Sequence, residues 1–366
     1  MPSARSTSAR CSHSARRVEE KIGSKGLGKR RNGGHDIGAG YLGSWALISR
    51  FPHNKDPMPL DSKTTSEFAV PTDGQRAQRK AWLQIHACVI LWGFTAILGR
   101  AITLPAMNLV VWRMALVACA LLAFPSVWRG LRDMQLRLVL IYAGIGIVIA
   151  LHWVTFYAAV KLANASVAAT CLALSPVFLA IVEPWIGGRR FKPFELVLGI
   201  AVVPGVALVV GGTPLGMQQG ILVGSVSAFF VAIFSALNKR FAGRADVRAV
   251  TFVEMCAGTL FVAITLYSIP HAGSMGIRPD ARDFALLLVL ATACTLVPFV
   301  MALSALRVLP AFGTQLVINL EPIYTIVLAM PLFGEQRELD LRFYFGVAIV
   351  VGAVFVYPAM MRTRRQ

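Results

Sequence analysis

The chain has 366 residues, of which 56% are hydrophobic, and its mean hydropathy is +0.64. A soluble domain is usually about 45–50% apolar, so this surplus is more than a soluble core of this length can hide. The formal net charge of +18 would suit a nucleic-acid-binding protein. Beyond the first eighty residues, however, most basic residues stand in short breaks between apolar runs, where membrane topology accounts for them better. We therefore expect an integral membrane protein with a lipid bilayer as its surroundings and no nucleic-acid partner.

Residues 1–80 form a basic, polar leader with 15 Lys and Arg and 7 Asp and Glu. Most of it is rich in Ser, Arg and Gly without sustained periodicity, which is typical of disorder. Three interpretations compete. The first stretch resembles an organellar transit peptide because it carries no acid before Glu19. It could also be a solvated basic tail. We favour a true start at Met58, with the preceding residues an artefact of gene prediction, because nothing upstream has the pattern of a fold.

Ten apolar runs follow the leader, separated by short polar breaks. Each is about as long as the 20 residues that a membrane-spanning helix needs, whereas a membrane strand needs about 10 alternating residues. The sequence therefore predicts an all-α integral membrane protein with ten transmembrane helices. The runs are residues 81–100, 107–124, 138–160, 164–187, 194–211, 220–238, 249–269, 284–305, 311–333 and 343–361.

Basic residues in the short loops predict the orientation of the spans. If the N-terminus is cytoplasmic, the cytoplasmic loops and the C-terminal end hold 14 Lys and Arg, against six on the opposite side. The bias favours a cytoplasmic location for both termini, which agrees with an even number of spans.

The second half of the apolar region repeats the first. Residues 161–195 align without gaps on residues 307–341, an offset of 146 that brings Ser175-Pro176 onto Glu321-Pro322. We expect a first five-helix repeat over residues 81–212, a second over residues 220–361, and a basic cytoplasmic tail at residues 362–366.

An odd number of spans in each half inverts the second half in the membrane. The loop charges agree: Arg189-Arg190-Phe191-Lys192 is net +3, whereas the aligned stretch from Glu335 to Asp340 is net −2. Inverted repeats are typical of secondary transporters, which bind substrate near the midplane between the halves. Channels and scaffolds have less need of this arrangement.

Several short segments in this order resemble the EamA-like, ten-span branch of the drug/metabolite transporter superfamily. The resemblance covers about residues 82–360 and implies a ten-helix transporter of small metabolites, often an exporter. The segments are Leu91-Trp92-Gly93-Phe94, Trp112-Arg113, Phe156-Tyr157-Ala158-Ala159, Ala165-Ser166, Leu174-Ser175-Pro176-Val177, Glu321-Pro322-Ile323-Tyr324 and Leu332-Phe333-Gly334-Glu335.

This chain departs from the family pattern in two places. Phe94-Thr95 follows Trp92-Gly93 where family members often carry a polar residue such as Asn. The first half reads Gly188-Arg189 where Gly-Glu is usual, although the second half keeps Gly334-Glu335. Both departures blur any inference about the substrate.

Glu321 is the first candidate for a substrate or proton pathway, because it lies near the middle of the ninth span. A charged group in hydrocarbon is strongly disfavoured unless it is paired, so Glu321 could exchange a proton or bind a substrate amine. Pro322 frees a backbone carbonyl one turn earlier, and Pro176 is the matching break in the fourth span. Alternatively, Glu321 caps backbone groups structurally. We expect the two breaks to face each other across the pseudo-two-fold axis.

The remaining candidates are polar or aromatic side chains within the spans. Gln315 and Asn319 are four residues apart on one helix face, so they either line a lumen or bond neighbouring helices. His152 is either a ligand or proton group or a packed, hydrogen-bonded residue. Trp153 and Tyr157 share a face, and Trp92 could stack on a substrate or simply pack.

Two further ionisable residues lie nearer the ends of their spans. Arg113 and Glu254 occupy equivalent positions in the two repeats, so inversion places them toward opposite membrane faces. We expect each to snorkel or bind locally rather than to form a direct pair.

No cysteine spacing indicates a metal site, and no nucleotide-binding motif or nucleophile–base arrangement is present, so we expect no cofactor and no enzymatic activity. The prediction is a secondary active transporter of a small organic metabolite, an exporter in a bacterial inner membrane driven by a proton or substrate gradient. The alternative is a non-transporting membrane sensor or scaffold. The sequence does not identify the substrate.

Overall fold

The computed structural model describes residues 73–188, 190–268 and 278–363, and these residues form helices and no strand. The expectations for the leader before residue 73 therefore lie outside the described residues. The helices are α1 (Asp73–Ala101), α2 (Ala106–Leu122), α3 (Pro125–Asp133), α4 (Leu136–Leu162), α5 (Ala165–Cys171), α6 (Ser175–Gly187), α7 (Pro193–Ile200), α8 (Val203–Gly211), α9 (Gln218–Phe241), α10 (Val247–Ser268), α11 (Ala281–Ala291), α12 (Val297–Leu306), α13 (Ala311–Ile318), α14 (Glu321–Phe333) and α15 (Leu341–Thr363). Short turns of other helix types are η1 (Leu172–Leu174), η2 (Leu215–Met217), η3 (Thr292–Leu296) and η4 (Glu335–Arg337).

Within the described ranges, seven helices or continuous helical segments are long and apolar enough to cross a membrane, or eight if the bent pair α2 and α3 is counted as one span. These findings support a multi-pass membrane protein. The expected span at residues 194–211 is divided into α7 and α8, which have 8 and 9 residues. Helix α2 has 17 residues and meets α3 at an angle of 93°. The count of ten spans stays a prediction.

Prolines explain where the central helices break. A proline has no N–H to donate and disfavours helical backbone in the residue before it. Accordingly, the helix that begins at Ala165 passes through the 3₁₀ turn η1 just before Pro176, and the helix that begins at Ala311 breaks just before Pro322. A π turn, η3, likewise precedes Pro298. The predicted central breaks are therefore present in both halves.

The two breaks meet in the middle of the protein. The Asn319 side-chain amide donates to the backbone oxygen of Ala173, 3.3 Å away, and these two residues are separated by 146 positions, the offset of the repeat. A contact between equivalent residues is expected on a pseudo-two-fold axis. The ends of α6 and α14 also match, because Gly188 and Gly334 have φ of 64° and 68°, left-handed values that glycine adopts without strain.

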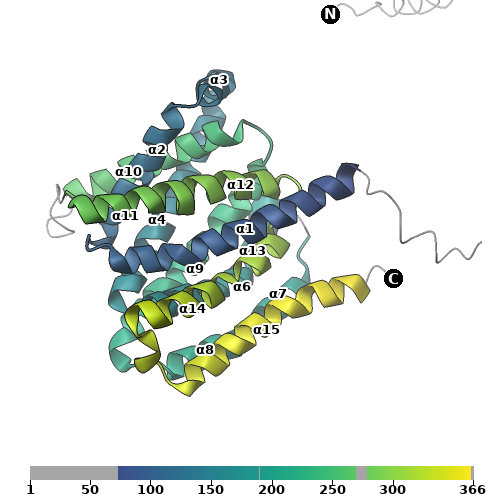
Figure 1. Ribbon diagram of the computed structural model, residues 1–366. Helices are drawn as coiled ribbons and strands as arrows, with labels where there is room; N and C mark the ends of the chain where they lie inside the picture. The colour runs from purple at the N-terminus through teal and green to yellow at the C-terminus, as the bar shows by residue number, and fades with distance from the viewer. Residues whose placement is uncertain (1–72, 189, 269–277, 364–366) are drawn as a thin grey trace, which may run out of the picture. The chain divides into compact units, whose positions relative to one another are not determined.

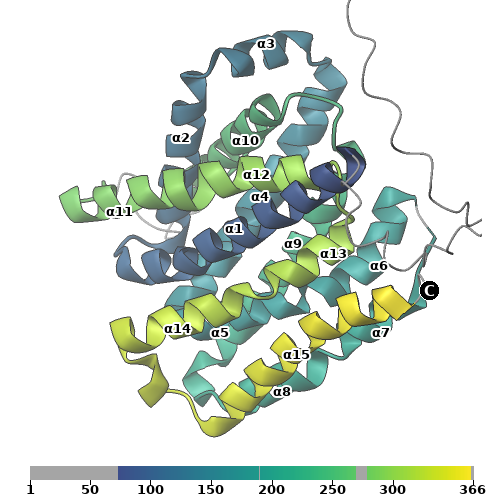
Figure 2. The ribbon, with the colours of Figure 1, turned by 45° about the vertical axis from the view of Figure 1, so that its right-hand side comes forward.

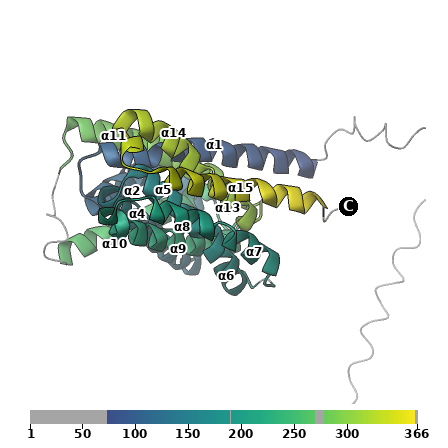
Figure 3. The same cartoon turned by 90° about the horizontal axis from the view of Figure 1, so that it is seen from below.

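Helices from different halves pack against one another. Helix α4 lies along α9, and α12 lies along α1. Figure 1 shows α15 alongside α8, and Figure 2 shows α13 and α14 in line beside α1. Seen from below, α6 and α7 lie side by side (Figure 3). Tight helix approaches use glycine: a Cβ on Gly205 would lie 2.7 Å from the backbone oxygen of Gly346.

The helix bundle has two ends, which we name the α5 end and the α13 end. The α5 end is where α1 finishes at Ala101 and α5 begins at Ala165. The α13 end is where α12 finishes at Leu306 and α13 begins at Ala311. The start of α1 lies at the α13 end, because Ala81 shares a hydrophobic cluster with Leu309.

Candidate functional site

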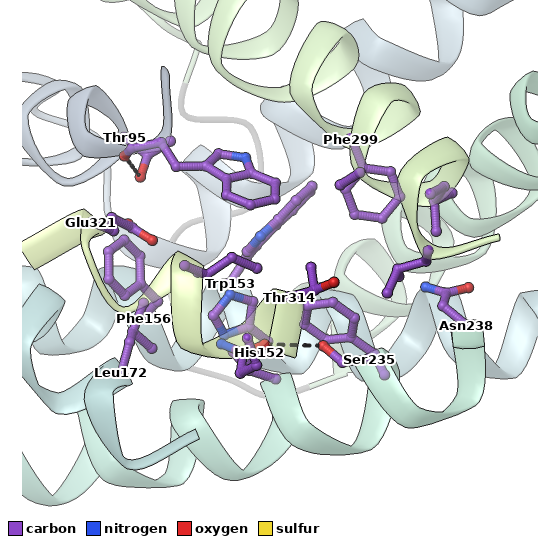
Figure 4. Close-up of a pocket in the computed structure, with 18 of the residues that line it drawn as sticks. Thr95, His152, Trp153, Phe156, Leu172, Ser235, Asn238, Phe299, Thr314 and Glu321 are labelled. Carbon is purple, nitrogen blue, oxygen red and sulfur yellow. Dashed lines mark hydrogen bonds between the residues drawn. The ribbon is translucent and has the colours of Figure 1, made fainter. Parts of the chain in front are cut away.

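A cavity lies between the two halves and is walled by α1, α2, α4, α9, α12, α13 and α14. Figure 4 shows Thr95 and Glu321 at one end of it and Asn238 at the other, with Trp153, His152 and Thr314 between them. Its apolar walls are Trp92, Trp153, Phe156, Leu172, Val231, Phe234, Phe299, Ala302, Leu303, Leu306, Ala311 and Ile318. Its polar walls are Thr95, Arg113, His152, Ser235, Asn238, Thr314, Gln315 and Glu321. Aromatic walls with a few polar groups are typical of sites for small organic molecules.

Arg113 is the cation of this cavity. Only 2% of the residue is exposed, so of the two expected alternatives it binds locally and does not snorkel to a membrane boundary. The Nε atom donates to the Thr295 hydroxyl at 2.7 Å and an Nη1 donor bonds the Tyr157 hydroxyl at 2.6 Å. The guanidinium carbon lies 3.9 Å from the centre of the Trp153 ring, a cation–π contact.

The backbone of α11 and α12 presents the Thr295 hydroxyl to Arg113. Thr295 lies in the π turn η3, and its hydroxyl also bonds the backbone oxygen of Leu290, five residues earlier. A π turn shifts the following side chains relative to a regular α-helix, and such turns are frequent at functional sites. Arg113 is thereby held in place by its neighbours rather than by a carboxylate bond.

Glu321 is the acid of the cavity. It is 5% exposed and lines the cavity wall, and no other described residue forms a hydrogen bond with its carboxyl group. Arg113 is close enough to interact with it electrostatically. The carboxyl group is thus available to a ligand or a proton, and the opposite charge of Arg113 stands in the same cavity. The structure places Pro322 beside it, buried at the start of α14.

His152 is packed and hydrogen-bonded, and it also lies in the cavity wall. Its Nδ1 atom lies 2.7 Å from the Ser227 hydroxyl, and that hydroxyl donates to the backbone oxygen of His152. The ring packs near Phe156 and Phe234, yet it also lines the cavity. His152 is therefore a packed, bonded residue with one side facing the cavity.

The polar stripe of the ninth predicted span divides between two roles. Gln315 lines the cavity and accepts a long bond of 3.4 Å from the Ser235 hydroxyl. Asn319 instead bonds Ala173 across the interface of the two halves. Gln315 thus lines the cavity and also bonds a neighbouring helix, whereas Asn319 only bonds a neighbouring helix.

Five predicted site residues line the cavity: Trp92, His152, Trp153, Gln315 and Glu321. Tyr157 does not line the cavity, but its hydroxyl bonds the Arg113 guanidinium. Pro176 is buried where α6 begins and is likewise outside the cavity wall.

Sequence reasoning missed other polar residues of the wall. Ser235 and Asn238 are three residues apart on α9, so they share a helix face, and this spacing could have revealed them. Thr95 and Thr314 carried no such signal, because isolated threonines are common in membrane helices. Arg113 was placed nearer the end of its span and was expected to snorkel or bind locally, so it was not counted among the residues of the site.

The α5 end of the bundle is closed by a cluster of charged groups. Glu335 is fully buried and accepts from the backbone N–H groups of Ala165 and Ser166 at 3.1 and 3.0 Å, as well as from the Ser166 hydroxyl. It also pairs with Arg100. Glu338 lies 3.6 Å from Arg100. The four N–H groups that begin a helix have no partner within it, and Glu335 supplies partners to two of them.

The α13 end is closed by different chemistry. The Lys239 ammonium donates to the backbone oxygens of Leu306 and Leu309, at 2.6 Å each. No acid caps the start of α13, where Pro310 stands at the N-cap position without a side-chain bond. The central cavity extends to Leu306 and Ala311, which belong to this end.

No group of three or more His, Cys, Asp or Glu that could hold a metal ion occurs among the described residues.

The sequence model of the EamA-like transporter family matches the chain twice, over residues 79–211 and 218–357. Twenty-five chains of solved structures match. One, described only as "Crystal structure of protein", has a TM-score of 0.59 and 16% sequence identity, and the match covers 78% of this chain and 99% of that chain. At this identity the similarity concerns the fold alone. No curated protein matches the chain.

Proposed function

Because this chain belongs to the EamA-like transporter family, we propose that it is a secondary transporter that moves a small organic metabolite by alternating access. The observation that carries the proposal is the central cavity, in which Arg113 and Glu321 face the same space. Ionisable side chains inside a membrane are costly and are usually retained for function. A scaffold or sensor without a ligand has no need of them.

The arrangement of the halves supports the mechanism. Alternating access requires one half to rock against the other around a central site. The contact between Asn319 and Ala173 lies between the halves, next to the cavity wall that Gln315 and Glu321 form. We expect ten spans in two inverted repeats, residues 81–212 and 220–361, with both termini cytoplasmic in a bacterial inner membrane and transport directed outward.

The substrate we propose carries an anionic group and an apolar or planar body. The Arg113 guanidinium has five N–H donors, and its bonds to Tyr157 and Thr295 engage two of them. The others suit a carboxylate or another planar anion. The rings of Trp92, Phe156 and Phe299 provide the apolar surface around it.

Glu321 would couple transport to protons by competing for Arg113. When its carboxyl group is charged, it offers the guanidinium an internal anion. When it is protonated, Arg113 is free for the anion of the substrate. A proton and an anionic substrate would then bind together, and proton binding at Glu321 would favour substrate loading.

The first experiment identifies a ligand. Thermal unfolding of the purified full chain is measured with organic acids, amino acids, nucleosides, polyamines and drugs. We expect stabilisation by molecules with an anionic group, and loss of that stabilisation in Arg113→Gln. Stabilisation by cationic polyamines alone would refute the substrate class, and absence of stabilisation by every class would favour a scaffold.

The second experiment tests proton coupling. Uptake of the identified ligand into proteoliposomes is measured with and without an imposed pH step, for wild type, Glu321→Gln and the control Glu183→Gln. Glu183 is also buried but does not line the cavity. We expect the pH step to accelerate uptake in wild type and control only. If Glu321→Gln keeps pH-driven transport at equal expression, Glu321 is not the coupling site. If a stabilising ligand is not transported at all, the result would favour a sensor over a transporter.

A further inference from the structure

Glu254 is the most completely buried acid in the described part of the chain that has no partner. It lies in α10 and is 0% exposed, and neither carboxyl oxygen has a hydrogen-bond partner. Nearby, the side-chain nitrogen of Asn238 in α9 is also buried and close enough to the Glu254 carboxyl group to interact with it, but no hydrogen bond of regular geometry joins the two. Buried polar groups are almost always bonded, so two neighbouring exceptions require an explanation.

The position of Glu254 is set by a close contact of two helices. A Cβ on Gly146 of α4 would lie 2.2 Å from the backbone oxygen of Glu254, so only glycine admits this approach. One turn earlier on α4, Tyr142 is near enough to interact electrostatically with Glu254. The carboxyl group is therefore enclosed among α4, α9 and α10.

Asn238 joins this enclosure to two cavities. It lines the central cavity and also a smaller pocket at the α13 end, whose walls include Tyr142, Phe241 and Arg307. An amide can serve either state of an acid, because its nitrogen donates to a carboxylate and its oxygen accepts from a carboxyl O–H. Asn238 is thus suited to stand beside a group that gains and loses a proton.

No cation among the described residues forms an ion pair with Glu254. Of the helices packed against α10, α2 holds Arg113, which is bonded to Tyr157 and Thr295. On α4, Tyr142 donates to the backbone oxygen of Phe241, and His152 is bonded to Ser227. The charged residues of α3 are exposed. Arg307, next to α12, donates to the backbone oxygen of Ala245.

We propose that Glu254, distinct from Glu321, is a proton-binding site: the Asn238 amide stabilises its charged form, and its proton is exchanged with the pocket at the α13 end. In the conformation described here the carboxyl group carries its proton, because an unpaired carboxylate in a low-dielectric interior is strongly disfavoured. Movement of α10 against α9 would expose it for release. This site lies outside the substrate cavity, so the inference does not depend on Glu321 or on the substrate class.

The test uses dicyclohexylcarbodiimide on the full chain in lipid nanodiscs. This reagent attacks protonated carboxyl groups in apolar surroundings: the acid O–H adds across one C=N bond, and the O-acylisourea rearranges to a stable N-acylurea. Peptide mass spectrometry locates the adduct. We expect Glu254 to be modified near neutral pH, and less as the pH rises, whereas Glu254→Gln removes the adduct from that peptide.

Glu335 is the matched control within the same chain. It is also 0% exposed, but it is paired with Arg100 and bonded by backbone N–H groups. We expect about ten-fold less adduct there, which corresponds to about 1.4 kcal/mol. Equal modification of Glu254 and Glu335 would show that burial alone governs the reaction and would overturn the proposal.

Infrared spectroscopy supplies a measurement that does not depend on access of the reagent. Wild type should show the C=O stretch of protonated carboxyl groups, and the intensity of that band should fall in Glu254→Gln by the share of one carboxyl group. If the band is unchanged and no adduct forms, Glu254 carries no proton and the proposal fails. If Glu254→Gln does not fold, the variant Asn238→Leu is tested instead. Without the amide donor, the charged form of Glu254 is less stable, so modification of Glu254 should persist to higher pH. An unchanged pH profile would refute the role of Asn238.

Discussion

Glu335→Gln should destabilise the protein far more than any comparable change at the neighbouring carboxylate. Glu335 stands on the short turn η4, yet its carboxylate bonds the first N–H groups of α5, which is 170 residues away in the sequence. It also pairs with Arg100 at the end of α1. One side chain therefore holds the first half of the protein to the second at the α5 end.

The expected loss in the free energy of unfolding follows from the interactions that glutamine keeps and those that it loses. Glutamine retains one oxygen, so one backbone N–H bond survives, but the charge that balances Arg100 disappears. Breaking a buried ion pair by removing one partner costs about 3–5 kcal/mol. The Arg100 side chain is 26% exposed, and water screens its charge partly, so we expect the low end of that range, about 3 kcal/mol.

The assay is unfolding of the full chain by SDS titration from mild detergent micelles, which yields the free energy of unfolding. Glu338→Gln is the control, because Glu338 shares Arg100 and a bond to Asn164 but its side chain is 38% exposed. Exposed pairs are worth about 0–1 kcal/mol. If the two variants lose equal stability, or if Glu335→Gln loses less than about 1 kcal/mol, the assignment of Glu335 as the group that holds the α5 end is wrong.

Three further predictions follow from contacts of the cavity and of α4. Arg113→Lys keeps the charge but loses the planar stack on Trp153, which is worth about 2 kcal/mol when desolvated. Ligand affinity measured by calorimetry should therefore fall at least ten-fold. Unchanged affinity would show that Arg113 is not part of the binding site. Gly146→Ala should destabilise the protein by about 1–3 kcal/mol through overpacking, whereas Gly144→Ala, with nothing within 4 Å of the added Cβ, should be neutral or slightly stabilising in the same thermal unfolding experiment; equal effects would contradict the close packing of α4 and α10. Asn319→Ala should lower stability by about 1 kcal/mol without changing ligand affinity, and Gln315→Ala should do the reverse; the opposite pattern would mean that their roles are exchanged.

The pattern of apolar runs predicted the helical fold well because hydrophobicity over about 20 residues is a strong local signal. Membership of the family, the repeat offset and the central breaks before Pro176 and Pro322 were visible in the sequence for the same reason. The split of α7 and α8 and the bend between α2 and α3 were not predicted. Both depend on how short segments pack against neighbouring helices. The hydrophobicity of an apolar run is the same whether its helix is continuous or broken.

The depth of a side chain in the protein, and the direction in which it points, were harder to predict from the sequence than the helices themselves. Arg113 was known to be unusual, but its position was judged along one helix, whereas its burial depends on Trp153 and Thr295 from two other helices. The same holds for Glu254, which we expected nearer the end of its span and which is fully buried. Gln315 and Asn319 lie on one helix face, yet only the tertiary packing decides which of them faces the cavity and which meets Ala173.

The two ends of the bundle are held by different groups. By the 146-residue offset, Glu335 corresponds to Arg189, and an arginine side chain has no acceptor for the N–H groups that begin a helix. At the α13 end, the Lys239 ammonium bonds two backbone oxygens. Charge-assisted bonds to a fully buried carboxylate are stronger than bonds from a half-exposed ammonium to neutral carbonyls. Opening the α5 end should thus cost more free energy than opening the α13 end, and the cavity, which reaches Leu306 and Ala311, extends toward the end that is easier to open.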